Sequence, residues 1–473
     1  MAITIIVKED NGDQVEITLD PERHDDGDWE EVCYQIGCSV SRELANRWLG
    51  VIGERLHQER ARSMEVEGFC ERTLMSRFGE VTVRRRLYQD ANGKYHFLVD
   101  EHLSWRPKQE ATPSLTAALV DSATKLSYRK ASMEAEKYSA GVLSSTTIHR
   151  LLQKVTQDAT QGERAEWQDC FDYGRLPPPG KRKVPVLYVE ADGVSVRLQR
   201  EGKQKRCELK NAIAYEGWER LPQRDERYRT VNKVVYCHGG DSQRYGVPFW
   251  EGASLAWHKE WDLGSVELIV LGGDDAEWID KGTEELPNVI RQLSGFHLSR
   301  SCRRGWKQGK DIYATIRSGA IWIGEAEERE GKTAQGSRKY VIERLKKGVD
   351  WRKKAESLGV EIPEGARGLG AIEGNEGNLF ADRMKDRGMS WTISGAHHMG
   401  KAIELAHNGD LRQWCDGKSP DAESRNARLS FALFQELDNC GSRGRLPALE
   451  GPHASRPWVG VLRNMTEPGY RVN

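Results

Sequence analysis

Apolar residues recur every three or four positions along residues 28–62, and this pattern predicts one long amphipathic helix. Residues 80–88 then change to a strict alternation of apolar and polar side chains, which is the pattern of a half-buried strand. Asn92 and Gly93 follow as a turn that tolerates positive φ, so the chain is expected to return as the second strand of a hairpin. Residues 1–110 are therefore predicted to form an α+β region.

A second helical region follows, because residues 113–158 again carry apolar side chains at helical spacing, interrupted at residues 140–143. Ser144 or Ser145 after this break is a natural N-cap. A helix, a break and a second helix form a helix-turn-helix-like unit, and an ordinary helical hairpin has the same pattern. On the first interpretation, residues 111–175 are a DNA-binding segment. The start of its second helix would contact DNA through the side chains of Ser145, Thr146, Thr147 and Arg150.

Beyond a proline-rich linker at residues 176–180, strand patterns alternate with helical ones. Three strands come first, then helix, strand, helix and a weaker strand, at residues 184–198, 208–216, 231–237, 248–261, 266–271, 276–285 and 289–297. This is the order of an α/β, ribonuclease-H-like fold. Residues 300–370 are polar, basic and helix-prone, and they read as an α-helical insertion before a last helix at 372–384. We predict such a domain over residues 184–415 and a C-terminal tail over 416–473.

Composition excludes several classes of protein. The chain has 71 basic and 72 acidic residues, and its net charge of −1 argues against a protein that simply coats DNA. The nine cysteines include no CxxC pair, so a structural zinc site is not expected. No apolar run approaches the roughly 18 residues that span a bilayer, and the first residues lack a signal segment. We expect no membrane association and a cytoplasmic location.

Three acidic residues stand out by their positions. Asp192 lies inside an otherwise apolar strand, where a carboxylate costs several kcal/mol unless it is paired or holds a cation. Asp274 closes the most hydrophobic strand of the chain, and ligands bind at such strand ends in open α/β sheets. Glu373 stands near the start of the late helix among several glycines, which allow a close approach to the backbone. A turn or cap role is the alternative for any one of them alone.

Carboxylates in this number suit phosphoryl chemistry. Magnesium prefers oxygen ligands, and manganese accepts the same set. Two such ions roughly 3.5–4 Å apart can hold both the attacking and the leaving oxygen of an in-line displacement. In this hypothesis Asp192 bridges the two ions, Asp274 binds one of them and Glu373 binds the other.

Short motifs over most of the chain, densest from Val184 onward, carry a family resemblance. They are residues 189–194 (VEADGV), 214–219 (AYEGWE), 266–279, 295–298 (GFHL), 368–375 (GLGAIEGN), 387–391 (RGMSW), 395–399 (GAHHM), 446–449 (LPAL) and 451–458 (GPHASRPW). With these motifs the sequence resembles the DDE transposases of bacterial insertion sequences, specifically the ISLre-type family, which is related to the Mutator-like group.

The resemblance implies a nucleoid-associated enzyme that binds double-stranded DNA at transposon ends and target, as a homodimer, with two Mg²⁺ or Mn²⁺ ions. The catalytic and metal-binding acids that it implies are Asp192, Asp274 and Glu373. The sequence departs from the family at two positions. Asp275 stands where the family usually has a glycine after the second acid, which makes it a backup ligand. Ser294 stands where the family often has an acid. Glu376, one turn after Glu373, is the backup for the third ligand.

Other polar residues near these motifs have weaker assignments. His297 could orient the scissile phosphate or an attacking water, and a satisfied core histidine is the alternative. Arginines of the insertion and of the late helix could contact phosphate: Arg303, Arg304, Arg383 and Arg387. For the last two, surface ion pairs with Asp382 and Asp386 are an equally good explanation.

The predicted reaction is metal-dependent cleavage at a transposon end, followed by attack of the freed 3′-hydroxyl on a target phosphodiester. A ribonuclease-H-like nuclease that cleaves without joining would use the same acids. A relic that binds DNA without chemistry, or a structural α/β protein with no nucleic-acid partner, are alternatives from other classes.

Overall fold

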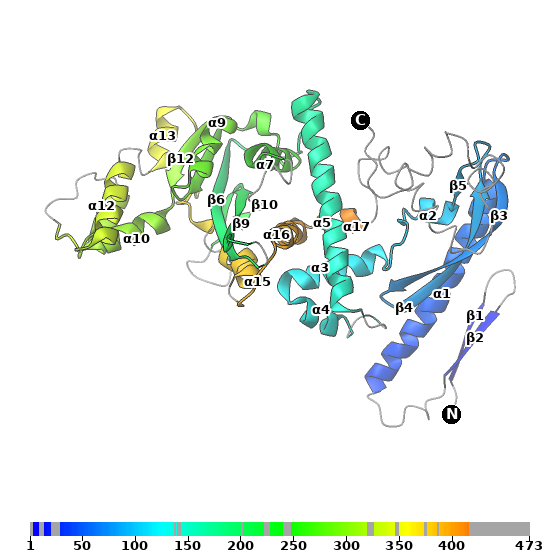
Figure 1. Ribbon diagram of the computed structural model, residues 1–473. Coiled ribbons are helices and arrows are strands. Elements are labelled where there is room, and N and C mark those ends of the chain that lie inside the picture. Colours follow the sequence, from blue (N-terminus) through cyan, green and yellow to red (C-terminus); the bar gives the residue numbers. More distant parts are fainter. Residues whose placement is uncertain are drawn as a thin grey trace. The chain divides into compact units, whose positions relative to one another are not determined.

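A computed structural model of the chain describes residues 3–8, 14–19, 29–136, 139, 143–199, 202–221, 228–239, 247–318, 326–345, 350–372, 376–385 and 387–415. The described residues fall into two compact units (Figure 1). The first contains the described residues up to Ser122, those within Tyr128–His149, and Arg412–Cys415. The second contains Ala123–Ser127 and Arg150–Leu411. The predicted tail at 416–473 lies outside the described residues.

The first unit combines a long helix with a three-stranded antiparallel sheet. Its elements are β1 (Ile3–Lys8), β2 (Gln14–Leu19), α1 (Trp29–Glu59), β3 (Glu65–Ser76), β4 (Gly79–Gln89), β5 (Tyr95–His96), α2 (Leu98–His102), α4 (Tyr128–Ala135) and α3 (Pro113–Lys125) as far as Ser122. The last residues of α3, from Ala123, belong to the second unit. Leu49 of α1 packs against Val81 and Val83 of β4. The predicted long helix and the strand at 80–88 are thus confirmed. The apolar face of the helix and the apolar face of the strand pack together in one small core.

One arginine of the basic run at 84–86 is buried in this unit. Arg85 is only 2% exposed, because it follows the alternation that also buries Val81 and Val83. It shares the carboxylate of Asp100 with Arg72, whose Nη1 lies 2.5 Å from Asp100 Oδ2. This cluster is internal to the unit.

The helical region continues into α5 (Ser145–Trp167), which is followed by a π-helical turn, η2 (Gln168–Asp172). The hydroxyl of Ser144 accepts a hydrogen bond from the backbone N–H of Thr147 at 3.1 Å, so the predicted N-cap is confirmed at Ser144. Residues 140–142 of the predicted break lie outside the described residues. The structure therefore shows helices here, and the helix-turn-helix remains a prediction.

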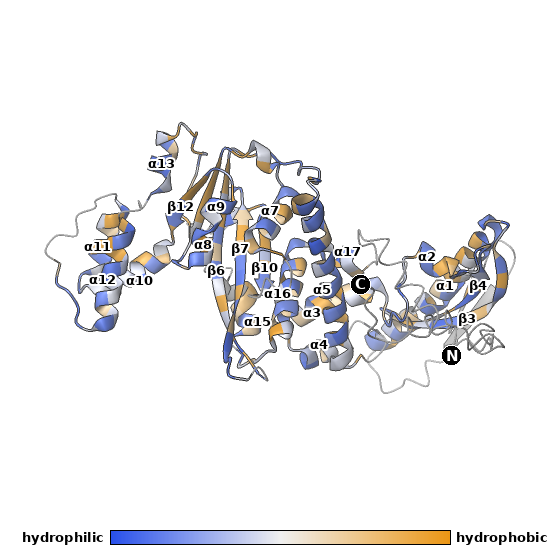
Figure 2. Ribbon diagram, turned by 45° about the horizontal axis from the view of Figure 1, so that its top comes forward, coloured by the Kyte–Doolittle hydropathy of each residue, from blue (hydrophilic) through white to orange (hydrophobic). Residues whose placement is uncertain are grey.

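The second unit is built on a mixed five-stranded sheet. Its elements as far as the sheet's last strand are β6 (Val186–Arg197), β7 (Arg206–Tyr215), β8 (Gly217–Arg220), β9 (Tyr228–Val231), β10 (Val234–Gly239), α7 (Phe249–His258), η3 (Leu263–Ser265), β11 (Leu268–Gly273), α8 (Glu277–Asp280), α9 (Gly282–Glu285) and β12 (Val289–Leu293). The strand order is β10-β7-β6-β11-β12. β6 is antiparallel to β7 and parallel to β11, and β7 is antiparallel to β10. A core rich in aliphatic side chains and tryptophan lies between the sheet and α7–α9. The strands of this sheet carry hydrophobic residues, which are coloured orange in Figure 2.

Two glycines in helices of this unit differ in how closely their surroundings are packed. A Cβ on Gly252 of α7 would lie 2.1 Å from the hydroxyl oxygen of Tyr236. A Cβ on Gly336 of the later helix α12 (Lys332–Leu345) would meet nothing within 4 Å. We expect Gly252→Ala to lower the free energy of unfolding by about 1–3 kcal/mol through overpacking. Gly336→Ala is expected to raise it by about 0.5–1 kcal/mol. Denaturant unfolding measures both, and equal effects would contradict the packing described.

The predicted helical insertion has a small core of its own. Its helices are α10 (Gly295–Gly305), α11 (Gly309–Arg317), α12 (Lys332–Leu345) and α13 (Trp351–Ser357). Side chains of α10, α11 and α12 pack together around Trp306 and Val341. At its base, the side-chain oxygen of Gln292 in β12 accepts a hydrogen bond from the N–H of Trp351 in α13 at 2.8 Å. The stretch that contains α10–α12 therefore leaves the sheet and returns to it at the same place.

The strand predicted at 289–297 is shorter than expected. It ends at Leu293, because the Ser294 hydroxyl accepts a hydrogen bond from the N–H of His297 and so begins helix α10. The late helix predicted at 372–384 is irregular where it is described. Residues 376–381 form a π-helical segment, η4 (Glu376–Ala381), which leads into α15 (Asp382–Met384). Residues 373–375 lie outside the described residues.

The described chain ends with α16 (Ile393–Asn408) and α17 (Leu411–Cys415), and α16 contributes a buried charge cluster to the second unit. The ammonium nitrogen of Lys401, which is 2% exposed, lies 3.1 Å from Glu163 Oε2 of α5 and 2.9 Å from Glu404 Oε2. The backbone N–H of Cys237 in β10 donates to Glu404 at 2.7 Å. These interactions tie α5 and α16 to the edge strand of the sheet. Within the described ranges, none of the helices has the length and hydrophobicity needed to cross a bilayer.

His238 of β10 gives the second unit a predictable response to pH. Burial lowers the pKa of His238 to about 4, against about 6.5 in the unfolded chain. Unfolding therefore takes up a proton between these values. The stabilisation is complete above pH 6.5 and is lost as the pH falls towards 4, by up to about 1.4 kcal/mol per pH unit.

The measurement is the free energy of unfolding between pH 4.5 and 6.5 for wild type and His238→Gln. Burial raises the pKa of Glu404 to about 7, and the stability from that group is lost as the pH rises, so only the difference between the two proteins isolates His238. We expect a smaller loss of stability towards low pH in His238→Gln. If the free energy of unfolding changed equally with pH in both proteins, His238 would take up its proton as readily in the folded protein as in the unfolded chain.

Candidate active site

Two of the predicted acids lie at the same edge of the mixed sheet. In the parallel pairing of β6 and β11, Ala191 stands opposite Gly273, and Asp192 and Asp274 each follow one of these residues. Asp192 is 9% exposed, and its Oδ1 accepts the N–H of Gly193 at 2.7 Å. The structure therefore places the first two acids on neighbouring parallel strands, at the carboxyl edge where α/β sheets bind ligands.

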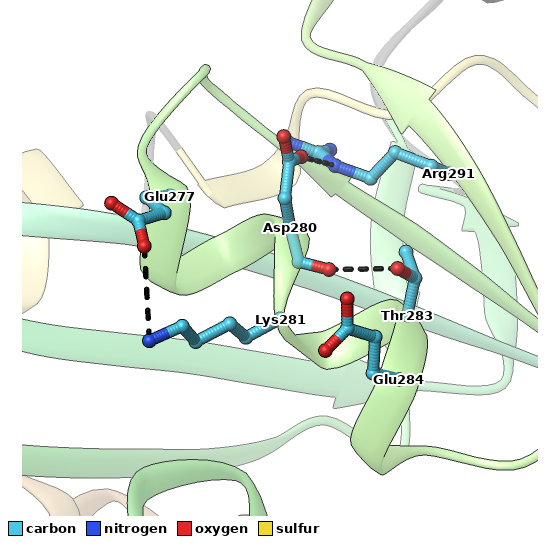
Figure 3. Close-up of a pocket in the computed structure, with 6 residues that line it drawn as sticks. All are labelled: Glu277, Asp280, Lys281, Thr283, Glu284 and Arg291. Carbon is cyan, nitrogen blue, oxygen red and sulfur yellow. Dashed lines mark hydrogen bonds and ion pairs between the residues drawn. The ribbon is translucent and has the colours of Figure 1, made fainter.

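Arg291 of β12 holds the backbone around Asp274. It donates to the carbonyl oxygen of Asp274, and its Nη1 lies 3.2 Å from the carbonyl oxygen of Leu271. Its Nε donates to Asp280 Oδ1 at 2.9 Å (Figure 3). The side chain of Asp274 itself accepts the N–H of Ala276 at 2.9 Å. The Arg291 guanidinium therefore holds the backbone at the end of β11. This role of Arg291 was not predicted from the sequence.

The shallow pocket beside Arg291 is lined by Glu277, Asp280, Lys281, Thr283, Glu284 and Arg291 (Figure 3). Two of its acids are already in ion pairs, Asp280 with Arg291 and Glu277 with Lys281 at 3.8 Å. We assign no ligand to this pocket; of its residues, Arg291 supports the Asp274 backbone.

Asp275, the backup for the second acid, has a partner of its own. Arg344 of α12 donates through Nε to Asp275 Oδ2 at 2.5 Å and forms an ion pair with the carboxylate. Because this pair ties the insertion to the end of β11, Asp274 is the better candidate for a metal ligand.

The start of α10 lies next to the second acid. The N–H of Ser294 donates to the carbonyl oxygen of Gly273 at 3.0 Å, so Ser294 follows β12 directly beside the Asp274 turn. His297 lies in the first turn of α10, is half-buried, and makes an edge-on contact with Phe296 at 5.4 Å between ring centroids. The histidine predicted as an auxiliary residue is thus on the element that begins at the candidate site.

A buried acid that the sequence analysis did not single out lies two residues before Asp192. Glu190 is 1% exposed, and its Oε1 accepts hydrogen bonds from the Tyr215 hydroxyl at 2.5 Å and from the N–H of Ala371 at 3.0 Å. Its Oε2 accepts the N–H of Ile372 at 3.2 Å. The signal that drew attention to Asp192, an acid inside an apolar strand, applies equally to Glu190.

The third predicted acid cannot be placed from the described residues. Glu373 and its side-chain surroundings lie outside them, and Glu376 is described only as the first residue of η4. The residue immediately before Glu373 is Ile372, which Glu190 holds against β6.

Electrostatics at this edge favour a cation. Partial burial, and then the negative charges of Asp274 and Asp192, raise the pKa of Glu208, which lies on the neighbouring strand β7, while Lys210 lowers it. Within the part of the chain that the structure describes, no three His, Cys, Asp or Glu side chains form a metal-ligand set. Asp192 and Asp274 provide the oxygen donors that Mg²⁺ prefers, so this pair fits part of such a set.

Arg383 is a correction to the predicted DNA contacts. It is 2% exposed, its Nε donates to the carbonyl oxygen of Ala123 at 2.8 Å, and its guanidinium lies 5.1 Å from the centre of the Trp391 ring. The neighbouring acids Asp382 and Asp386 indicated a surface residue of the predicted late helix, but the contact with the distant Ala123 buries it. Arg383 is therefore a packing residue.

The other predicted DNA contacts lie nearer the surface. Arg387 pairs with Asp382 at 2.5 Å, which is the ion pair considered as its alternative role, and it also donates to the carbonyl of Lys125. Arg303 and Arg304 are exposed on α10. On the first turns of α5, Thr146 and Arg150 are exposed, while Ser145 and Thr147 are half-buried.

These features define an α/β protein with two adjacent aspartates at the carboxyl edge of a mixed sheet and a helical insertion beside them. Residues 29–418 match the UPF0236 family, which is described as an uncharacterised protein family. The chain belongs to this family.

Two relatives illustrate its range. A UPF0236 protein of Caldanaerobacter subterraneus subsp. tengcongensis, whose name joins eleven locus designations, is 24% identical over 410 residues, covering 81% of this chain and 78% of the relative. A UPF0236 protein of Streptococcus gallolyticus, named for its place in the vanSb 3′ region, is 24% identical over 399 residues, covering 78% of this chain and 81% of the relative.

Proposed function

We propose that the protein is a DDE-type transposase that cleaves the ends of an insertion sequence and joins them to target DNA. Asp192, Asp274 and Glu373 are its three acids in this proposal. The observation that carries it is the placement of Asp192 and Asp274 after paired residues of two neighbouring parallel strands. Carboxylates on neighbouring strands can together hold the ions of a two-metal phosphodiester site.

The sheet supports this function through its topology. Three antiparallel strands come first in the chain, and two strands parallel to the first of them are added on the other side of β6. This is the arrangement expected of a ribonuclease-H-like fold. The helical excursion α10–α13 falls between β12 and the segment that precedes Glu373, where the sequence predicted an insertion.

The residues around the acids suit the proposed chemistry. When bound, two Mg²⁺ or Mn²⁺ ions would activate the attacking oxygen and stabilise the leaving oxygen. Asp192 and Asp274 would hold them, and Arg291 would keep the Asp274 backbone in place. His297, in the first turn of α10, would orient a phosphate oxygen in this proposal. The exposed Arg303 and Arg304 would bind DNA phosphates, with an affinity that falls as salt increases.

The names of the relatives support a mobile element. One name covers eleven locus designations in a single organism, as expected when an element has been copied within a genome. A transposase also has to hold two element ends together, so we expect a homodimer on DNA.

The test uses the full chain and labelled duplexes from the DNA that flanks its coding sequence. With Mg²⁺ or Mn²⁺, wild type is expected to cleave at the element end and to join the 3′-hydroxyl to a target duplex. Asp192→Ala, Asp274→Ala and Glu373→Ala should each lose both steps while still binding the ends. If Glu373→Ala remains active, the third ligand is Glu376 or another acid.

Other outcomes would select the alternatives. Cleavage without joining indicates a ribonuclease-H-like nuclease with the same acids. Binding of the ends without cleavage in either metal indicates a DNA-binding relic. Neither binding nor cleavage would leave a structural α/β protein and would overturn the proposal.

A further inference from the structure

Glu190 connects the strand that carries Asp192 to the chain that enters the Glu373 segment. Side chains alternate along a strand, so Glu190 and Asp192 project from the same face of β6. On that face, the two oxygens of Glu190 accept the backbone N–H groups of Ala371 and Ile372 at 3.0 and 3.2 Å. One carboxylate therefore binds two consecutive amides of a segment that lies 181 and 182 residues away.

The same segment is fitted closely to the sheet. A Cβ on Gly272, which pairs with Glu190 across β6 and β11, would lie 2.6 Å from Leu369 Cδ1 and 3.0 Å from Glu190 Cγ. Gly370 has φ +150°, a conformation that favours glycine, and it turns the chain between Leu369 and Ala371. Packing and hydrogen bonding thus fix this turn at one position on the sheet.

The surroundings of Glu190 suit an anchor better than a metal ligand. Both oxygens are hydrogen-bond acceptors, three donors point at them, and the side chain is 1% exposed. A buried carboxylate is costly unless it is satisfied in this way, and charge-assisted bonds to backbone N–H groups are among the strong ones. The carboxylate is therefore bound within the protein as an anchor for this backbone.

We propose that Glu190 is a positioning residue for the candidate active site: it holds the backbone of Ala371 and Ile372 on β6, two residues from Asp192, and so fixes the chain that directly precedes Glu373 in the sequence. This rests on the proposed function in so far as Glu373 is the third acid. The anchoring of the turn itself does not depend on any activity.

The first measurement is amide hydrogen exchange of the full chain without metal or DNA. Glu190→Gln keeps the shape of the side chain but loses its charge and one acceptor oxygen, so exchange of the Ala371 and Ile372 amides should accelerate about tenfold or more. Exchange in β7 and β11 should stay as in wild type. The matched control is Tyr215→Phe, which removes the third donor and leaves both backbone contacts, and should change the two amides far less.

The second measurement is single-turnover cleavage of labelled element ends. We expect Glu190→Gln to reduce cleavage by about 10- to 100-fold in Mg²⁺, as for other residues that orient metal ligands, with end binding unchanged. Partial recovery in Mn²⁺ would mark a misplaced ligand, since a merely destabilised protein would not respond to the metal. Gly370→Ala, which strains the same turn without touching the buried acid, should give the same pattern if Glu190→Gln does not fold.

The outcomes separate the two proposals. Unchanged exchange at Ala371 and Ile372 in a folded Glu190→Gln protein overturns the anchor. Faster exchange with cleavage equal to wild type overturns the positioning role. If wild type itself does not cleave, the proposed function fails, and the exchange experiment alone decides the anchor.

Discussion

Asp192→Asn is expected to abolish end cleavage while leaving the folded protein at least as stable as wild type. The carboxylate is 9% exposed, sits beside Asp274, and contributes to the negative potential that raises the pKa of Glu208. Asparagine keeps an oxygen that can accept the N–H of Gly193, and removes the charge. Loss of a metal-binding carboxylate should reduce the cleavage rate on the order of 10³-fold or more.

Thermal unfolding with and without divalent metal gives the second half of this prediction. Without metal, the variant should unfold at the same temperature as wild type or a higher one, because like charges at the strand edge repel. With Mn²⁺ at ten times its Kd, wild type should gain about 1.4 kcal/mol and the variant should gain little. Asp169→Asn, an exposed acid away from the site, is the control and should behave as wild type. A metal response of the same size in Asp192→Asn would remove Asp192 from the ligand set.

Lys401→Met is expected to destabilise the second unit by about 3–5 kcal/mol. Lys401 is 2% exposed, and its ammonium is the cation between Glu163 and Glu404. Although burial lowers it, these two carboxylates raise the pKa of Lys401 above its usual value, which shows that the charged form is favoured where it lies. Methionine fills a similar volume but leaves the acids without their cation.

Denaturant unfolding with a matched surface variant measures this effect. Lys281→Met removes a lysine paired with Glu277 at the surface, where both side chains are largely exposed, and should cost at most about 0.5 kcal/mol. The triple variant Lys401→Met, Glu163→Gln, Glu404→Gln should recover much of the lost stability, since no buried charge is left unpaired. If Lys401→Met were as mild as Lys281→Met, the cluster would not link α5 and α16 to the sheet.

The sequence predicted elements whose apolar spacing is regular. The strand carrying Asp192 and the strand preceding Asp274 stood out because their side chains are buried on both faces, and they were found at Val186–Arg197 and Leu268–Gly273. Their adjacency followed from the ribonuclease-H-like order of elements as a whole, since β7, β10 and α7 lie between them in the chain. The placement of the first two acids on neighbouring strands could therefore be predicted from the sequence.

What could not be predicted depends on contacts between distant segments. Alternation alone places Arg85 on the buried face, but its partner Asp100 belongs to a short helix outside the strands. Arg383 has a surface-like sequence context, and only Ala123, 260 residues away, makes it a core residue. Lys401 and Glu163 lie on separate helices whose packing no local pattern encodes. Whether a charged residue is buried is the hardest feature to predict from a sequence. Its burial depends on a partner elsewhere in the chain and not on the hydrophobic periodicity around it.

The hydrogen bond between Gln292 and Trp351 has a consequence for how the chain can vary in length. The end of β12 and the start of α13 are held together, so the helices between them leave and rejoin the sheet at one point. Lengthening such a closed excursion costs little, about 0.6 kcal/mol for each doubling of a flexible loop. The number of residues between Asp274 and Glu373 can thus change in this stretch without moving the strands. The spacing between the acids is therefore a poor guide to recognising this architecture in other sequences.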